Sequence, residues 1–212
     1  VVLLFLFILM YNYLGESMKY RLYKIVECVG TPLFKLIFRP TIIGKENIPL
    51  DGRVIICGNH TSNLDAAFMI SVPDRIVHTL AKKELFNSKI GNAFFRSMGC
   101  ISVNRSIHDE NAKSEAINVL NNEGAIALFP EGTVNKTDKI ILPFKYGAVS
   151  FASKTHSPIV PFVITGKYKL FRKSITIEYG KAYYVGDDLE KENEKLQNII
   201  INMLKRKEKD GK

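Results

Sequence analysis

Short apolar runs alternate with amphipathic stretches along most of the chain. Seven of these runs have the length and apolar character of buried strands. The predicted strands cover residues 53–57, 76–81, 100–103, 125–129, 159–164, 174–179 and 181–185. The last two are expected to lie at an edge of the sheet.

Apolar residues at helical spacing occupy the stretches between these runs. Helices are predicted to start near Leu64, capped by Ser62 or Asn63, and to span residues 90–98, 109–121, 146–155 and 187–207. Strands that alternate with helices are typical of an α/β fold with a mixed, largely parallel sheet flanked by helices. In a chain of 212 residues, the pattern predicts one such domain, at residues 41–212.

The chain begins with a run, residues 1–10, that is almost wholly apolar. A helix continuing to Leu14 would be about 21 Å long, shorter than the roughly 30 Å hydrocarbon core of a bilayer. A truncated span, an interfacial anchor and the apolar part of a signal sequence all fit this run. Alternatively, the natural protein starts at Met18 and residues 1–17 do not belong to it, because codons for Gly15-Glu16 can spell a ribosome-binding sequence.

Residues 22–38 form an amphipathic pattern. Apolar positions recur at helical spacing, with basic and aromatic side chains interleaved. This composition is typical of a helix lying in a membrane surface, although a helix packed on its own domain has the same spacing. Pro32 should kink the stretch or divide it into two helices. We therefore expect residues 1–40 to form a helical membrane-anchoring segment at the cytoplasmic face of the cell membrane.

The composition favours an anionic partner and a reducing compartment. The net charge is +9, which suits nucleic acid, an acidic lipid surface or a phosphorylated substrate. Nucleic-acid binding is poorly supported because no stacking platform or known binding motif is present. Three cysteines without a Cys-x-x-Cys pair do not form a disulfide framework, and the four histidines lack metal-site spacing.

The first candidate for chemistry is the pair His60 and Asp65. His60 directly follows a predicted strand, and Asp65 lies in the first turn of the next helix. A carboxylate that holds one imidazole nitrogen lets the other nitrogen take a proton from a hydroxyl. Taken alone, the pair is better explained by a core histidine near a capping aspartate, and the motifs that follow reverse this preference.

A second motif, Phe129-Pro130-Glu131-Gly132-Thr133, follows another predicted strand. Glycine allows a ligand to approach the backbone, and its amide can donate to a phosphate or an oxyanion. Glu131 could bind substrate hydroxyls. A tight turn with an exposed glutamate is the alternative.

Basic residues follow further strands. Arg105 comes after the strand ending at Val103, where arginine is well suited to bidentate phosphate binding, and Lys82 and Lys83 follow another strand. Lys145 is a similar candidate, and a surface location is the alternative for each cation. Since ligand sites in such sheets gather beyond the carboxyl ends of the strands, these residues are expected to converge with His60 and Glu131.

Together these blocks resemble the 1-acylglycerol-3-phosphate acyltransferase family within the glycerolipid acyltransferases. The likeness extends from about Thr41 to Ile164 and is carried by residues 59–65, 81–85, 99–105, 129–133 and 160–162. It implies transfer of a fatty acyl group from acyl carrier protein or coenzyme A to the free hydroxyl of lysophosphatidic acid, giving phosphatidic acid. No cofactor beyond the acyl donor, and no metal, is implied.

Carried over by position, the resemblance assigns roles to the candidate residues. His60 would be the general base and Asp65 its partner, while Arg105, Glu131 and Gly132 would bind the glycerol phosphate. Substrate contacts are expected also from Thr133, Lys82 and Lys83, and Val160 and Pro161 would shape a substrate pocket.

One position departs from the family pattern. Where the family commonly has arginine after Phe-Pro-Glu-Gly-Thr, this chain has Val134, so Lys136 or Lys139 would supply the phosphate contact. An acyltransferase acting on another lyso-lipid, a hydrolase using His60 and Asp65 on water, and a non-enzymatic basic lipid-binding module are the alternatives. The sequence has no Gly-x-Ser-x-Gly elbow and no cysteine beside His60, so an acyl-enzyme is not required.

Overall fold

A computed structural model describes residues 21–210 and shows one seven-stranded sheet in the order β1-β7-β6-β2-β5-β3-β4. Only β6 and β7 pair antiparallel, so the expected mixed, largely parallel sheet is confirmed. The strands are β1 (Thr41–Ile43), β2 (Val54–Gly58), β3 (Val77–Lys82), β4 (Ile101–Val103), β5 (Ala125–Leu128), β6 (Ile159–Gly166) and β7 (Ile175–Tyr179).

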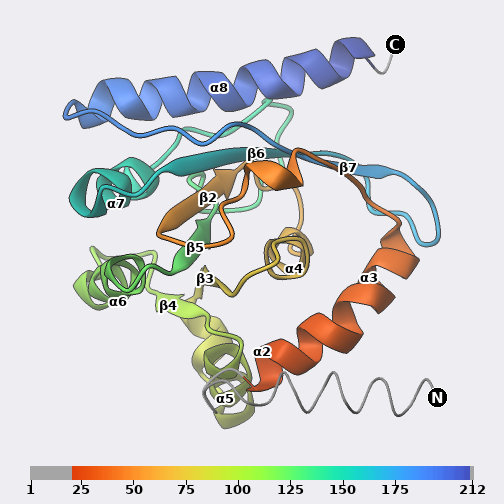
Figure 1. Ribbon diagram of the computed structural model, residues 1–212, viewed down its shortest axis with the longest axis horizontal. Helices are drawn as coiled ribbons and strands as arrows, with labels where there is room; N and C mark the ends of the chain where they lie inside the picture. Colours follow the sequence, from red (N-terminus) through yellow and green to blue (C-terminus); the bar gives the residue numbers. More distant parts are fainter. Residues whose placement is uncertain (1–20, 211–212) are drawn as a thin grey trace.

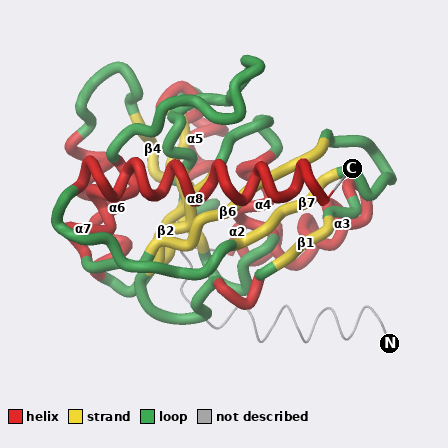
Figure 2. Tube along the Cα trace, turned by 90° about the horizontal axis from the view of Figure 1, so that it is seen from above, coloured by secondary structure: helices red, strands yellow, loops and turns green. Residues whose placement is uncertain are grey.

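Helices cover both faces of this sheet (Figure 1). Helices α6, α7 and α8 pack on one face, whereas α3 and α4 pack on the other. Their bounds are α2 (Arg21–Ile25), η2 (Val26–Gly30), α3 (Thr31–Phe38), η3 (Lys45–Asn47), α4 (Asp65–Ser71), η4 (Lys83–Phe86), α5 (Lys89–Ser97), α6 (Glu110–Asn121), α7 (Gly147–Thr155) and α8 (Leu189–Asp210). Figure 2 shows α8 running across the strands it covers.

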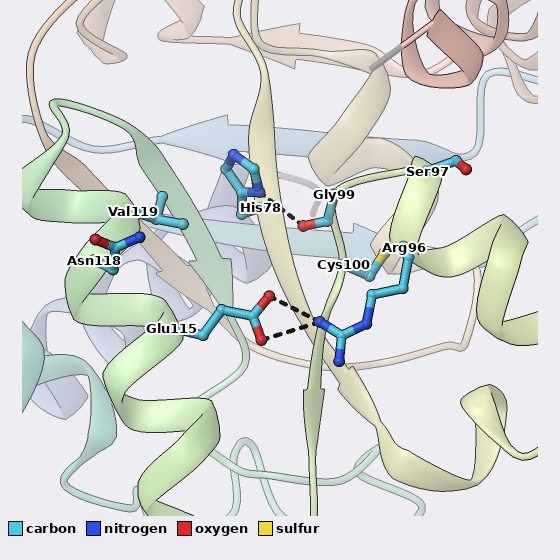
Figure 3. A pocket seen from close by; sticks show the side chains of 8 residues that line it. All are labelled: His78, Arg96, Ser97, Gly99, Cys100, Glu115, Asn118 and Val119. Carbon is cyan, nitrogen blue, oxygen red and sulfur yellow. Dashed lines mark hydrogen bonds and ion pairs between the residues drawn. The ribbon is translucent and has the colours of Figure 1, made fainter. Parts of the chain in front are cut away.

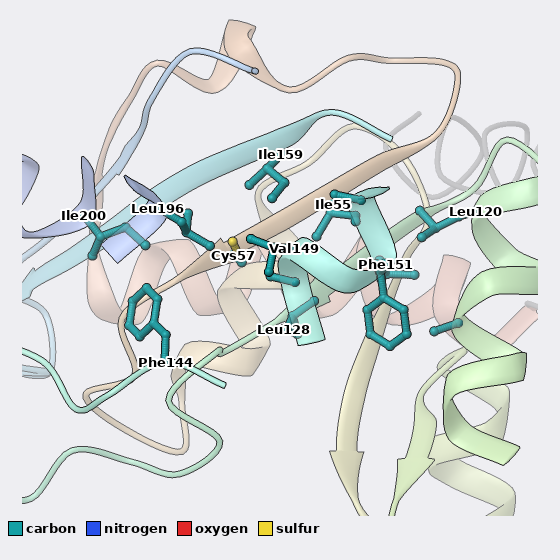
Figure 4. Close-up of a cluster of buried hydrophobic side chains, with 14 of the residues drawn as sticks. Ile55, Cys57, Leu120, Leu128, Phe144, Val149, Phe151, Ile159, Leu196 and Ile200 are labelled. Atoms are coloured by element: carbon teal, nitrogen blue, oxygen red, sulfur yellow. The ribbon is translucent and has the colours of Figure 1, made fainter. Parts of the chain in front are cut away.

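The central strands are apolar on both sides because both of their faces are covered. In β2, Ile55 and Cys57 point into the core beneath α7 and α8, which Figure 4 shows in detail. The alternate residues Val54 and Ile56 point into the opposite core, which contains Phe68 of α4. This arrangement explains why the strands have continuous apolar runs instead of alternating patterns.

Two expectations at the edge of the sheet were wrong. Residues 181–185 form no strand in the structure, and Tyr183 makes an isolated bridge to Ile159. The edge beside β7 is instead formed by β1, which pairs with it in parallel. Three residues of intermediate and exposed burial are too few to show the apolar alternation by which a strand is recognised.

The N-terminal segment stays helical from Arg21 to Phe38, and its hydrogen bonding changes just before Pro32, where a kink or a division into two helices was expected. The π-helical turn η2 lies between α2 and α3, and the amide of Thr31 donates to the carbonyl of Val26, five positions back. Proline has no N–H to continue the regular α-helical pattern, which accounts for a change of hydrogen bonding beside it. The expectations for residues 1–17, including a start at Met18, lie outside the described residues.

The two sides of this segment differ. Tyr23 is fully buried, and its hydroxyl accepts a hydrogen bond from the Val77 amide at 3.1 Å, so one side packs on the domain. The opposite side exposes apolar side chains at a helical spacing, namely Ile25, Val29, Leu33 and Leu36. Among residues 21–210, no helix is both long enough and apolar enough to cross a bilayer.

Candidate active site

His60 and Asp65 are in direct contact where the chain leaves β2. Nδ1 of His60 lies 2.9 Å from Oδ2 of Asp65, and the carboxylate is fully buried. Gly58 ends the strand at a point where an added Cβ would lie 2.1 Å from the carbonyl oxygen of Phe162. Glycine is therefore required there for β2 to approach β6 and direct the following residues into the site.

The turn between the two residues wraps around the carboxylate. Oδ2 of Asp65 accepts the amides of Thr61 at 2.6 Å and Ser62 at 2.8 Å. Neither Ser62 nor Asn63 caps α4, which begins at Asp65 with Leu64 at its N-cap position and no side-chain cap, so that expectation was wrong. The amides turn toward Asp65 because its charge makes it the stronger acceptor.

Both the backbone and the ring of His60 are fixed by contacts with neighbouring residues. Its amide donates to Oε1 of Glu131 at 2.8 Å, and its carbonyl accepts the amide of Asn135 at 2.8 Å. The ring stacks on Phe129, with the ring centroids 3.9 Å apart. Because Nδ1 faces Asp65 and no described residue bonds to Nε2, that nitrogen can accept a proton from a bound molecule.

Glu131 lies behind the site wall. Its two carboxylate oxygens accept the amides of His60 and Leu142, the latter at 2.7 Å, and the side chain is buried. Burial raises the pKa of Glu131, and the two amide bonds partly oppose that effect. Glu131 therefore connects the loop of His60 with the loop of Leu142. Its expected contact with substrate hydroxyls stays a prediction.

Gly132 has a left-handed conformation, with φ of 72°. Its amide donates to the carbonyl of Phe129 at 2.9 Å, so it is not available to a phosphate or oxyanion in this structure. A Cβ at this position would lie 3.0 Å from the Lys145 side chain. The glycine thus shapes the turn that carries Glu131 and Thr133.

A cavity of about 980 Å³ opens onto His60. Three cationic side chains line it, those of Lys82, Arg105 and Lys136, and no acidic residue does so among the described residues. Much of the remaining lining is apolar and includes Val26, Phe34, Ile70, Leu85, Phe94, Phe95 and Met98. The cavity thus combines a positively charged region with an apolar wall.

The predicted site residues divide into two groups around this cavity. Lys82, Arg105 and Thr133 line it with His60, as does Val134. Lys83, Lys139 and Lys145 are not among the lining residues. Of the two lysines considered as a replacement for the missing arginine, Lys136 is therefore the one at the cavity.

Val160 and Pro161 lie in β6 and take no part in the cavity lining. Val160 packs in the core beneath α4. Pro161 lies opposite Cys57 in the pairing of β6 with β2, and its carbonyl accepts the amide of Gly180 at 2.7 Å. Their expected effect on a substrate pocket remains a prediction.

Two further contacts of the site had no signal in the sequence. The hydroxyl of Tyr168 donates to Oδ1 of Asp65 at 2.5 Å, and burial together with the nearby carboxylate raises the pKa of Tyr168. Asn59 exchanges two hydrogen bonds with the backbone of Ile164, at 2.8 and 2.9 Å. Both contacts join residues more than 100 positions apart, so no local spacing could signal them.

A second, smaller cavity of about 440 Å³ lies between α5 and α6 (Figure 3). Its lining includes His78, whose Nδ1 lies 2.8 Å from the carbonyl of Gly99, and the ion pair of Arg96 with Glu115. His78 thus contributes to a different cavity from His60, as expected for a structural histidine. Among residues 21–210, no three His, Cys, Asp or Glu side chains are grouped as metal ligands.

Comparisons with known proteins agree with this architecture. Residues 39–165 match the family model described as Acyltransferase. The 1-acyl-sn-glycerol-3-phosphate acyltransferase of Borreliella burgdorferi is 31% identical over 192 residues, covering 85% of this chain and 76% of that protein. The enzyme of the same name from Bacillus subtilis is 29% identical over 136 residues, covering 62% and 67%.

A solved structure supports the fold. The 1-acyl-sn-glycerophosphate acyltransferase PlsC from Thermotoga maritima superimposes with a TM-score of 0.72, at 22% identity, covering 95% of this chain and 87% of that one. The match of the family model to more than half of the residues, together with the relative from Borreliella burgdorferi, decides the family. The chain belongs to the acyltransferase family, which includes the 1-acyl-sn-glycerol-3-phosphate acyltransferases, and it is an O-acyltransferase enzyme.

Proposed function

We propose that the enzyme transfers a fatty acyl group from a thioester to the free hydroxyl of lysophosphatidic acid, giving phosphatidic acid in phospholipid synthesis. One observation carries this proposal: the His60 ring opens onto a cavity that is cationic in one region and apolar in another. Lysophosphatidic acid has a phosphate, a free hydroxyl and an acyl chain, which match those features. The names of the relatives point to the same acceptor.

The reaction needs one base and no acyl-enzyme intermediate. Nε2 of His60 takes the hydroxyl proton while the hydroxyl oxygen attacks the thioester carbonyl. The tetrahedral intermediate then expels the thiolate, which receives the proton from the imidazolium and leaves as the thiol. Asp65 keeps Nε2 directed toward the cavity and stabilises the imidazolium between these steps.

The cationic side chains are suited to the phosphate of the acceptor. Arg105 can bind two phosphate oxygens at once, and Lys82 and Lys136 add positive charge. Because Val134 cannot contribute a charge, Lys136 takes over the contact that arginine commonly makes in the family. Thr133 lies on the same wall and can donate a hydrogen bond from its hydroxyl.

The apolar wall is suited to a fatty acyl chain. Side chains of η2, α3, α4 and α5 contribute to it, so the N-terminal segment forms part of the cavity. The donor is an acyl thioester of coenzyme A or acyl carrier protein, and the reaction requires no further cofactor and no metal. Holding both substrates beside His60 supplies the proximity that an already activated thioester needs.

The enzyme works at the cytoplasmic face of the cell membrane, where its lipid substrate resides. The exposed stripe of Ile25, Val29, Leu33 and Leu36 supports this location, because such a stripe is suited to burial in the interface. Lys24 and Lys35 lie within the same segment. This segment therefore packs on the domain with one side and offers the other to the membrane.

The deciding experiment uses the purified full chain with acyl-coenzyme A or acyl carrier protein and radiolabelled lysophosphatidic acid. Formation of phosphatidic acid that is lost in His60→Ala supports the proposal. Release of free fatty acid without an acceptor would indicate a hydrolase. A faster reaction with a lyso-lipid lacking the phosphomonoester would assign another acceptor, and full activity of His60→Ala would exclude the proposed base.

A further inference from the structure

The hairpin between β6 and β7 carries a surface that the acyl-transfer chemistry does not use. The surface consists of the exposed residues of the run Lys167-Tyr168-Lys169-Leu170-Phe171-Arg172-Lys173, whereas Tyr168 is half-buried and points to the site. Leu170 and Phe171 are 63% and 64% exposed at the tip, and the four basic residues around them are exposed as well. Within the described part of the chain, none of these four cations forms an ion pair with an acidic side chain.

The tip is built so that Phe171 stays exposed. Phe171 has φ of 57°, a left-handed conformation that is rare for a bulky side chain. Its amide donates to the carbonyl of Ile37 at 2.5 Å, which leaves the ring outside. At the base of the tip, the Lys167 amide donates to the Ser174 carbonyl at 3.0 Å, and Oγ of Ser174 donates to the Lys167 carbonyl at 2.7 Å. These backbone contacts hold the tip in one conformation.

The hairpin lies beside the end of α3, as Figure 1 shows. The ring of Tyr168 packs against that of Phe38, with 5.6 Å between the centroids, and the Phe171 amide bonds to Ile37. The exposed residues of the hairpin are therefore attached to the same helix that exposes Leu33 and Leu36. Two elements far apart in the sequence thus offer apolar side chains from neighbouring parts of the surface.

We propose that residues 167–173 form a second membrane-contact element, which inserts Leu170 and Phe171 into an anionic lipid surface. Four cations within seven residues, none paired with an acidic side chain of the described residues, would be costly to place against a neutral apolar partner, whereas anionic headgroups neutralise them. Two adjacent apolar side chains between basic residues match the interface between headgroups and acyl chains. This inference deepens the proposed function, because it specifies how the enzyme meets the membrane that holds its acceptor.

The same hairpin also reaches the catalytic pair. Tyr168 lies two residues before Leu170, and its hydroxyl bonds to Asp65. A contact of Leu170 and Phe171 with lipid would therefore fix the hairpin that supports Asp65. The surface element and the candidate base are linked by one short segment of chain.

The chain contains no tryptophan, which allows a direct test on the protein of this sequence. Phe171→Trp places a single fluorophore at the hairpin, and Leu50→Trp places one at a site with an equal exposed fraction of 64%, before β2. We expect vesicles containing phosphatidylglycerol to shift the emission of the Phe171→Trp protein to shorter wavelength, and lipids with brominated chains to quench it. The emission of Leu50→Trp should stay unchanged. An unchanged emission in both proteins, although the protein sediments with the vesicles, would overturn the proposal.

A second measurement tests the charges without using activity. Binding of Lys169→Ala/Arg172→Ala to anionic vesicles should be weaker by roughly fivefold for each charge removed, while Lys181→Ala should bind as the wild type does. Equal affinity of the double variant and the wild type, or equal binding to phosphatidylcholine vesicles, would contradict the charge part of the proposal. Since neither measurement includes a thioester, both outcomes are independent of the acyl-transfer assay.

Discussion

The hydroxyl of Tyr168 donates a 2.5 Å hydrogen bond to Oδ1 of Asp65, across 103 positions of sequence. Oδ2 of the same carboxylate contacts Nδ1 of His60, so the two carboxylate oxygens bind different side chains. The phenol ring is held in turn by Phe38 and Phe68. Tyr168 is therefore a positioning residue that fixes the carboxylate against which the candidate base is oriented.

Tyr168→Phe removes this bond and keeps the ring. A hydrogen bond to a charged group contributes about 1.5–3 kcal/mol, so we expect kcat to fall about tenfold or more. KM for both substrates should change little, because the ring still packs. The melting temperature should fall by several degrees, because the same bond also stabilises the folded state. Steady-state kinetics check this, with Tyr184→Phe, which lies at an exposed position, as the control. A rise in KM with unchanged kcat would show that Tyr168 acts on binding instead.

Glu131→Gln tests the link between the His60 loop and the Leu142 loop. An amide group has one accepting oxygen, so one of the two backbone amides loses its partner, at a cost of about 1–3 kcal/mol. We expect the variant to be less stable and, because the His60 loop is less well held, less active. Denaturant unfolding and the transfer assay check both effects, and unchanged stability would contradict this structural role.

The same variant has a defined pH dependence. Because burial raises the pKa of Glu131 in the folded protein, the folded state binds this proton more tightly than the unfolded state. The wild type therefore gains stability from this group as the pH falls through the folded pKa toward the unfolded value near 4.5, and loses that contribution as the pH rises. Relative to Glu131→Gln, the wild type should thus be more stable near pH 4.5 than at pH 7. The opposite trend in unfolding at the two pH values would contradict the direction of the shift.

Lys136→Ala tests phosphate recognition. Loss of a charge-assisted bond to phosphate should raise KM for lysophosphatidic acid about tenfold, with little effect on a lyso-lipid that lacks the phosphomonoester. Lys139→Ala is the matched control, because Lys139 is absent from the cavity lining. Val134→Arg should change KM in the opposite direction, since it adds a cation at a lining position. Equal effects of the two lysine variants would show that only the general positive field matters.

The cysteines provide a test of direct transfer. Cys28 is exposed, whereas burial raises the pKa of both the Cys57 and the Cys100 thiol. In the native protein we expect one thiol to react rapidly with a disulfide reagent, and Cys28→Ser should remove that reaction without changing activity. Cys100 lines the cavity, so a reagent could block the cavity there without any role of the thiol in the reaction. Loss of activity in Cys100→Ser or Cys57→Ser with the fold intact would instead show that a cysteine takes part in the chemistry, contrary to the direct mechanism.

The amphipathic and apolar patterns determined most of the secondary structure. Six of the predicted strands match β2 to β7 to within one or two residues, because fully covered strands require continuous apolar runs. There were two exceptions. The strand predicted at 181–185 is absent from the sheet. Strand β1 was not predicted, because its three residues are only partly buried or exposed. The contact between His60 and Asp65 could also be predicted from the sequence, because residues five positions apart can meet across one turn.

The parallel topology predicted that several candidate site residues lie at one edge of the sheet. Only the tertiary structure showed which of their side chains line the cavity. Lys82 and Arg105 line the cavity while Lys83 does not, and Glu131 faces backbone amides. Which way a side chain points at a strand exit depends on the packing of the loop that follows, which sequence spacing does not encode.

The sequence by itself determined most of the strands and helices, the candidate pair His60 and Asp65, and the family, because each depends on residues that lie close together in the chain. Tertiary structure decided the support of Asp65 by Tyr168, the pairing of Asn59 with Ile164 and the placement of the exposed hairpin beside α3. The physical reason is that these contacts join segments brought together only when both faces of the sheet are covered.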